Sequence, residues 1–284
     1  MIVSKCIKFA ASVIGIILVG CLPALFKGIS INIPGYLSQV DIILHQLVHI
    51  NEIKYPYNGS VYYLFPSIVN PYFYSMIILF GSLIFSFVIA LAGLLITYYL
   101  PVTFKRIVLF IAFIGESLPD VSIIVLFQFI VIGLLQETGI LVMNVVQGFT
   151  SRIYLMPILC LSVLPACFFF RMMVILSSEQ EKMDYVEFAK SKGLMSGQIF
   201  FKHILRNIMP SLVSYSKSII LMLLSNLVLT EYMFGMDGLS MFIYSHPIPI
   251  IFTVSLLFVF IVFSIFYSIL AWIIKKLTGK KVVI

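Results

Sequence analysis

The sequence predicts an all-α, polytopic membrane protein, and its composition, its apolar runs and one polar segment support this fold class. Of the 284 residues, 62% are hydrophobic and only 10% are charged, whereas about a quarter of the residues in soluble domains are charged. A helix needs about 20 apolar residues to cross the hydrocarbon core of a bilayer, and runs of this length recur along the chain. Residues 177–210 form the longest polar segment. Such a segment has to lie in water, where a soluble partner can contact it.

Six apolar runs are long enough to be transmembrane helices. We expect these helices at 7–26, 71–100, 107–135, 153–176, 211–230 and 250–274. The chain then divides into two parts. Residues 1–70 would form one helix and an external loop, and residues 71–284 would form a core of five helices that includes the polar segment. Within the external loop, we expect one amphipathic helix around residues 37–50.

The basic residues predict the orientation in the membrane. All but three of the 18 Lys and Arg residues fall on one side of the six predicted spans, and the exceptions are Lys27, Lys54 and Arg152. Cytoplasmic loops of membrane proteins carry the excess of Lys and Arg. We therefore expect both termini and residues 177–210 in the cytoplasm. The net charge of +7 then records membrane topology and predicts no nucleic-acid partner.

No set of residues predicts a catalytic, cofactor-binding or metal site. The cysteines lie in or beside apolar runs, with no CxxC pair and no histidine at ligand spacing. His45 and His49 have the i, i+4 spacing of a metal-binding pair, but no third ligand is in register, which favours surface histidines. The chain also lacks the G-x-x-x-x-G-K-[ST] loop that cradles ATP phosphates. We therefore expect a protein that is not an enzyme.

Residues 184–210 predict two helices. The first, at 184–192, would carry Tyr185, Phe188 and Ala189 on one face and end at a Gly193 cap. Ser196 would cap the second helix, which Pro210 would end. The amphipathic second helix would lie against the membrane end of the bundle and hold the first helix out into the cytoplasm.

Two carboxylates, Glu116 and Asp120, lie around Pro119 inside the predicted span at 107–135. Ionisable residues at membrane depth are costly and usually face an aqueous path. Their i, i+4 spacing would place them on one helix face, where they could line a translocation pathway and favour a cationic group. The alternative is a position near the interface, or neutral, hydrogen-bonded carboxyl groups. Arg171 is expected to extend to the cytoplasmic interface.

The polar segment also carries a family motif. The residues from Glu187 to Gly193, EFAKSKG, fit E-x-A-x-x-x-G and resemble the EAA loop of ABC-importer permeases. The longer string DYVEFAKSKGL, followed by HILRN and Pro210, is similar to the dipeptide, oligopeptide and nickel branch. Supporting matches are Leu164-Pro165, Arg171, Glu231-Tyr232-Met233-Phe234, Gly238-Leu239 and Ser117-Leu118-Pro119. Phe188 departs from the branch, where many members have a second Ala, and so does Ser240, where a Gly is usual.

This resemblance implies a type I ABC importer permease fold with a bacterial inner-membrane or plasma-membrane location. It implies that the chain forms half of a translocation pathway for peptides, nickel or metal chelates, without choosing among these. The implied partners are a second permease subunit, in a heterodimer or homodimer, two cytoplasmic ATPase subunits that bind the ATP, and an external substrate-binding protein. The residues implied to dock on the ATPase are Tyr185, Glu187, Phe188, Ala189, Lys190, Gly193 and Leu194. The external loop, with Glu231, Phe234 and Gly238, would meet the binding protein.

Two other classes of protein are weaker readings of the sequence. An ion- or proton-coupled secondary transporter could use Glu116 and Asp120, but it predicts internal hydropathy repeats that the sequence does not show. It also leaves the EAA-like motif unexplained. A membrane enzyme would need a cluster of nucleophilic or metal-binding side chains, whereas the four histidines are scattered along the chain.

Overall fold

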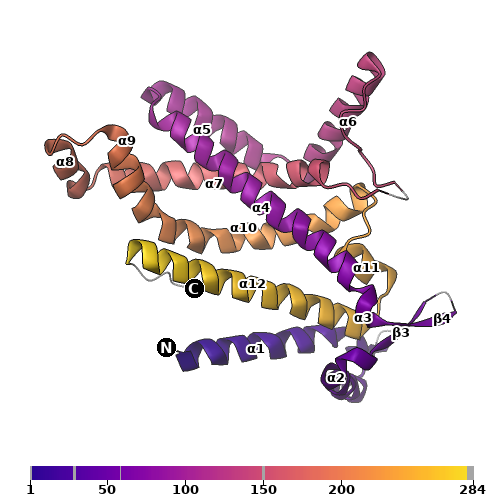
Figure 1. Cartoon of the computed structure of the whole chain (residues 1–284). Coiled ribbons are helices and arrows are strands. Elements are labelled where there is room, and N and C mark those ends of the chain that lie inside the picture. Colours follow the sequence, from indigo (N-terminus) through magenta and orange to yellow (C-terminus); the bar gives the residue numbers. More distant parts are fainter. Residues whose placement is uncertain (1, 28–29, 58, 149–150, 280–284) are drawn as a thin grey trace. The chain divides into compact units, whose positions relative to one another are not determined.

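The computed structural model describes residues 2–27, 30–57, 59–148 and 151–279, and most of them are helical (Figure 1). Among these residues, five helices are long and apolar enough to cross a membrane. They are α4 (Val69–Tyr98), α6 (Asp120–Thr138), α7 (Leu155–Glu181), the continuous helix Ser196–Met233, and α12 (Pro249–Thr278). The first predicted span is instead a shorter apolar stretch, Ile7–Gly20, within α1 (Ile2–Gly20). The fold is thus an all-α membrane fold with five candidate spans and one shorter apolar helix.

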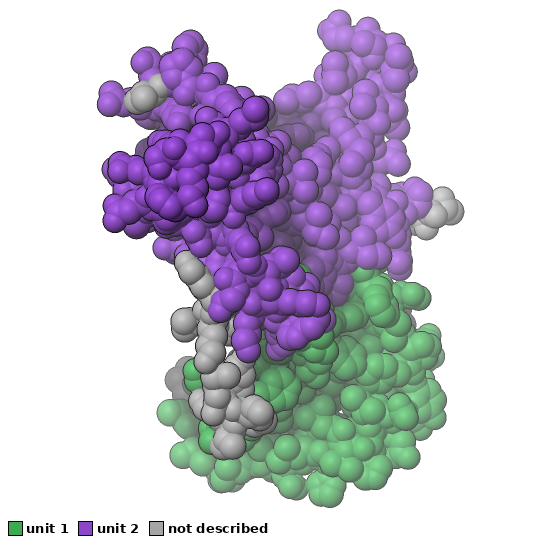
Figure 2. All heavy atoms as spheres, turned by 60° about the vertical axis from the view of Figure 1, so that its left-hand side comes forward, with its two compact units in different colours: residues 1–75, 237–266 green, residues 76–236, 267–284 purple. Residues whose placement is uncertain are grey.

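The chain forms two compact units, coloured separately in Figure 2. Unit 1 contains Met1–Ser75 and Asp237–Phe266, and unit 2 contains Met76–Met236 and Tyr267–Ile284. Two of the three boundaries fall inside α4 and α12 and the third falls between α10 and α11, so neither unit is a contiguous stretch of sequence.

Unit 1 contains α1, the region that the sequence predicts as an external loop, α11 (Leu239–Ser245) and most of α12. The expected amphipathic helix is present as α2 (Ile33–Val48), and the Asn32 side chain caps it by accepting a hydrogen bond from Gly35 N at 3.0 Å. Two short antiparallel pairs were not predicted. They are β1 (Phe26–Lys27) with β2 (Ser30–Ile31), and β3 (Lys54–Tyr57) with β4 (Ser60–Tyr63). The rest consists of 3₁₀ turns at Leu22–Leu25 and Ile50–Glu52 and of α3 (Leu64–Ser67).

Unit 2 is organised around α7, which packs against α5 (Val102–Ser117), α6 and α10 (Arg206–Met233). Small residues permit close approach of neighbouring helices to α7, at Gly93 of α4 and at Gly115 of α5. A Cβ added to Gly93 would meet the Phe170 ring at 3.0 Å, and one added to Gly115 would meet Cys167 Sγ at 2.7 Å. Phe169, Phe170 and Met173 of α7 are accordingly buried, which makes α7 the central helix of this unit.

The predicted third span is wrong as one continuous helix. Helix α5 ends at Ser117, Leu118 and Pro119 are extended with ψ of 135° and 137°, and α6 begins at Asp120. Proline disfavours helical backbone at the residue before it and has no backbone N–H to donate to a preceding turn. Glu116 therefore lies at the end of one helix and Asp120 at the start of another, rather than on one helix face.

Pro210 does not end a helix, contrary to the prediction. The chain is helical from α9 (Ser196–Ile199) through a π-helical segment, Phe200–Leu205, into α10, and Pro210 lies inside α10. Membrane helices tolerate proline because neighbouring groups and local π adjustments compensate for the missing hydrogen bond. Together with the extension of α7 to Glu181, this continuity leaves only residues 182–195 between two long helices.

Candidate functional site

The short helix α8 (Asp184–Ser191) lies between α7 and α9, and in Figure 1 it stands at the same end of both helices. Asp184 and Glu187 occupy its first turn and Lys190 its last. This order places negative charge at the positive end of the helix dipole and positive charge at the negative end, which stabilises a helix as short as α8.

Gly193 ends α8 as the sequence predicts. Its φ is +76°, in the left-handed region that favours glycine. Gly193 N donates to Lys190 O at 2.9 Å and Leu194 N donates to Ala189 O at 3.3 Å. These two bonds form a Schellman motif, which satisfies carbonyl groups that a helix end would otherwise leave unpaired.

The predicted common face of Tyr185, Phe188 and Ala189 is not present. Ala189 is buried at 3% exposure together with Val186 at 1%, whereas Phe188 is 60% exposed. Tyr185 is half-buried, and its hydroxyl donates to Gln180 Oε1 at 2.7 Å. Val186 and Ala189 therefore attach α8 to the protein, and their apolar i, i+3 spacing was the signal for this role in the sequence.

The exposed residues of α8 and its flanking turns include both apolar and charged side chains. Along the chain, Phe188 stands between Met183, the N-cap residue of α8, and Met195, the N-cap residue of α9; the two methionines are 46% and 75% exposed, and Leu194 is 37% exposed. Lys192 Nζ lies 4.3 Å from the centre of the Phe188 ring, while Glu187 and Lys190 are also exposed. Flexible methionines beside an aromatic anchor suit a protein-binding surface. Neither methionine was among the docking residues predicted from the sequence.

The predicted Ser196 cap is also absent. Met195 is the N-cap residue of α9, and no side chain makes a capping hydrogen bond there. The α9 start is held instead by α4: Tyr98 Oη donates to Ser196 O at 3.5 Å, and the Tyr98 and Phe200 rings lie 4.6 Å apart.

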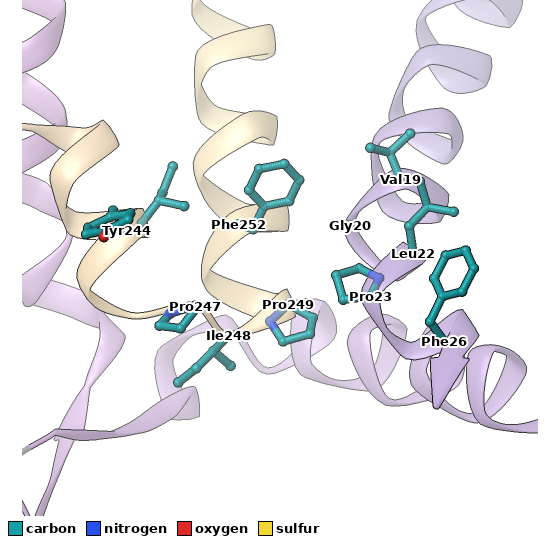
Figure 3. A pocket seen from close by; sticks show the side chains of 11 residues that line it. Val19, Gly20, Leu22, Pro23, Phe26, Tyr244, Pro247, Ile248, Pro249 and Phe252 are labelled. Carbon is teal, nitrogen blue, oxygen red and sulfur yellow. The ribbon is translucent and has the colours of Figure 1, made fainter. Parts of the chain in front are cut away.

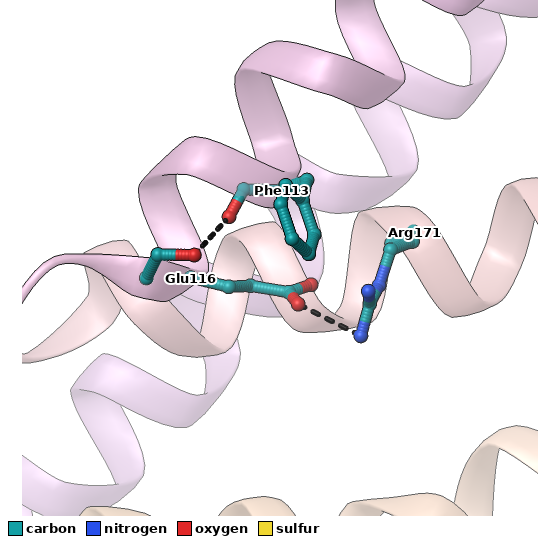
Figure 4. Close-up of polar contacts among 4 residues, drawn as sticks. Phe113, Glu116 and Arg171 are labelled. Carbon is teal, nitrogen blue, oxygen red and sulfur yellow. Dashed lines mark hydrogen bonds and ion pairs between the residues drawn. The ribbon is translucent and has the colours of Figure 1, made fainter.

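A charged pair joins α5 to α7 (Figure 4). Arg171 Nη2 lies 2.8 Å from Glu116 Oε2, with the two side chains 32% and 14% exposed. Glu116 Oε1 and Arg171 Nε are buried without a hydrogen-bond partner among the described residues. Arg171 is therefore paired with Glu116, a partner that the sequence did not predict. The pair also places a cation near the negative C-terminal end of α5, where a lone carboxylate would be unfavourable.

Asp120 has a different neighbour. Its side chain lies near the Asn226 side chain of α10, and it occupies the first turn of α6, where the helix dipole favours a carboxylate. Pro119 is exposed. The same two helices are linked at Gln128, whose Nε2 donates to Met233 O at 3.4 Å and to Val145 O at 3.2 Å.

Glu231 and Phe234 were predicted in an external loop, but α10 continues to Met233 and both side chains are 0% exposed. Phe234 O accepts a hydrogen bond from Gln147 N at 2.9 Å, and Glu231 O accepts one from Met236 N at 2.8 Å. Gly238, which belongs to unit 1, is buried and forms the N-cap of α11. Glu231 and Phe234 therefore belong to the buried end of α10, and Gly238 begins α11, instead of forming an exposed loop.

Two further openings lie in unit 1. His45 and His49 line a hollow with Glu52 and Lys54, but the described residues contain no cluster of three or more groups able to hold a metal ion. The second opening, of about 910 Å³, lies between the end of α1 and the turn into α12 (Figure 3). Its labelled side chains are almost all apolar, including Pro23, Pro247 and Phe252.

Comparison with known proteins identifies the family. Residues 89–280, more than half of the chain, match the model described as "Binding-protein-dependent transport system inner membrane component". A search of curated proteins found no match. Members of the matched family are transport components that are not catalytic and bind no cofactor themselves, and their systems include an ATPase and a binding protein. The chain belongs to this family, as an inner-membrane permease component of a binding-protein-dependent ABC transporter.

Proposed function

We propose that the chain is one permease subunit of an importer for peptides, nickel or metal chelates, and that it forms half of the translocation pathway with a second permease subunit. Both termini and α8 lie in the cytoplasm in this proposal, as the distribution of Lys and Arg favours. Two ATPase subunits bind ATP on that side. The similarity of DYVEFAKSKGL and HILRN to the dipeptide, oligopeptide and nickel branch supports this substrate class.

The observation that carries the proposal is the construction of α8. Val186 and Ala189 fix the helix to its own protein, while Phe188 and the flanking Met183 and Met195 present apolar surface to water. Several exposed apolar residues on one short, otherwise polar segment are typical of a protein-binding surface. The ATPase subunit is the cytoplasmic partner that the family supplies, and Phe188 is the anchor that we expect it to accept.

The translocation pathway is proposed to include Glu116, Pro119 and Asp120, at the break between α5 and α6. A broken membrane helix is tolerated where the backbone lines a cavity or is covered by protein. The polar side chain near Asp120, that of Asn226, is neutral, whereas Glu116 is already paired with the Arg171 cation. This pairing also weakens the alternative of a secondary transporter that uses both carboxylates as an ion site.

The proposal is tested by purifying the tagged chain with its partners in mild detergent and identifying the co-purifying proteins by mass spectrometry. We expect wild type to retain an ATPase subunit, and Phe188→Asp and Gly193→Pro to lose about 90% of it, because a buried charge or a broken cap removes the anchor. Phe104→Asp is the matched control, since Phe104 is 55% exposed at the start of α5. The proposal is wrong if no ATPase accompanies wild type, or if Phe104→Asp and Phe188→Asp lose it equally.

A further inference from the structure

Covalent connections explain how a movement of α8 would reach α7 and α9, but not how it would reach α4. Helix α8 follows α7 directly and precedes α9, whereas α4 is joined to α5 and has no direct chain connection to the ATPase-docking segment, residues 182–195. Helix α4 can therefore follow that movement only through noncovalent contacts, which include its packing on α7 at Gly93 and Phe170 and the contacts made at its own end.

The contact at that position is Tyr98. Its ring packs on Phe200 at 4.6 Å and 53°, and Phe200 is 1% exposed at the first residue of the π-helical segment. Its hydroxyl donates to Ser196 O at 3.5 Å, in the first turn of α9. Two points of contact on one short stretch restrict both sliding and rotation of the end of α4 against α9.

Tyr98 also lies against the other helix that holds the docking segment. Together with Ser177 and Glu181 of α7 and Lys105 of α5, it lines a small cavity of about 10 Å³. Ser177 is 3% exposed, and its hydroxyl has no hydrogen-bond partner among the described residues. Tyr98 therefore lies beside α7, which precedes the docking segment, and beside α9, which follows it.

Tyr99, the next residue of the chain, also lies close to α9. A Cβ added to Gly197 would lie 3.3 Å from Tyr99 Oη, so α9 approaches the end of α4 at a residue with no side chain. The π-helical segment begins three residues later, at Phe200. Such segments are local adjustments in helices and are frequent at functional sites. Phe200, whose ring contacts that of Tyr98, is the first residue of this segment.

We propose that Tyr98 is a positioning residue for transport: it makes α4 move together with the docking segment when the ATPase acts on α8. This inference rests on the proposed function, because it assumes that an ATPase binds α8. The ring carries the coupling, since packed side chains transmit rigid-body movement between helices, whereas the hydroxyl makes only one long hydrogen bond.

The test is a spin-label distance measurement in the assembled transporter, between Val88→Cys on α4 and Lys182→Cys at the start of the docking segment. Val88 is 54% exposed and Lys182 is exposed, and although Lys182 is the first residue of the docking segment, it is not one of the residues proposed to contact the ATPase. The native cysteines are first replaced by alanine. Distances are recorded without nucleotide and with ATP and vanadate. With the native Tyr98, we expect the same narrow distribution in both states, because the two positions move as one body.

With Tyr98→Ala, the two distributions are expected to differ by at least about 2 Å, the size of typical interface helix shifts, while ATP hydrolysis stays within about twofold because α8 is unchanged. Tyr98→Phe and the exposed-tyrosine control Tyr215→Ala (39% exposed) are expected to behave as the native protein. If Tyr98→Ala does not assemble, Phe200→Leu, which keeps an apolar side chain but removes the ring, takes its place.

An unchanged distance in both states of Tyr98→Ala or Phe200→Leu would overturn the inference, and so would a distance change with native Tyr98. Failure of the proposed function gives a different result, since no ATP hydrolysis would accompany even the native protein.

Discussion

Glu116 Oε2 and Arg171 Nη2 lie 2.8 Å apart, and this ion pair links the end of α5 to the middle of α7. Each residue also has one buried polar atom without a partner, Glu116 Oε1 and Arg171 Nε, among the described residues. The two charges therefore depend on each other, because few other groups compensate for their loss of hydration.

Removing one partner of this pair should destabilise the protein more than removing both. We expect Arg171→Met to cost on the order of 2 kcal/mol, below the range for fully buried pairs because the Arg171 side chain is partly exposed. The double variant Glu116→Gln/Arg171→Met should recover most of this loss, since no unpaired charge remains. Thermal unfolding of all variants in one detergent measures the coupling. Additive losses would show that the pair is not coupled.

Local features of the fold could be predicted from the sequence, whereas contacts between helices could not. The Gly193 cap was predictable because a Schellman motif involves only neighbouring residues. The partner of Glu116 was not, because Arg171 comes from another helix and hydropathy carries no information on contacts between spans. Proline was ambiguous for the same reason: the chain breaks at Pro119 but continues through Pro210, where the upstream π-helical segment accommodates it. Apolar runs located the long helices, whereas the hairpin of β3 and β4 was missed although the sequence carries Asn58-Gly59, a typical hairpin-turn signal, between the two strands.

The two carboxylates at the break should affect substrate charge unequally. Asp120→Asn is expected to reduce uptake of a lysine-containing dipeptide about tenfold relative to a neutral dipeptide, the effect of about 1.4 kcal/mol of lost attraction. Glu116→Gln should leave this ratio within about twofold, because Arg171 already neutralises Glu116. Competitive uptake into proteoliposomes that contain the complete transporter measures both ratios. Equal ratios for Asp120→Asn and native protein would exclude Asp120 from charge selection.

The left-handed backbone at Gly193 should make α8 sensitive to a single methyl group. Gly193→Ala is expected to destabilise the end of α8 by about 1 kcal/mol, since φ of +76° is unfavourable for residues with a Cβ. Hydrogen exchange at the Leu194 amide, which donates to Ala189 O, should become roughly five times faster. Gly133→Ala in α6 is the control, because no atom lies within 4 Å of its added Cβ. Unchanged exchange at Leu194 would show that the cap does not limit the order of α8.

Gly20, the last residue of α1, should tolerate no side chain because α12 lies against it. A Cβ there would collide with Thr253 Oγ1 and come within 3.1 Å of Thr253 Cβ. Thr253 cannot turn away freely, since its hydroxyl donates to Pro249 O at 2.8 Å. Gly20→Ala should therefore lower the free energy of unfolding by about 1–3 kcal/mol, as overpacking does, and Thr253→Ala should restore part of it. Gly15→Ala, on the same helix with no atom within 4 Å, should cost nothing measurable in the same thermal unfolding assay. If both glycine variants lose the same stability, helix propensity explains the loss and the contact with Thr253 does not.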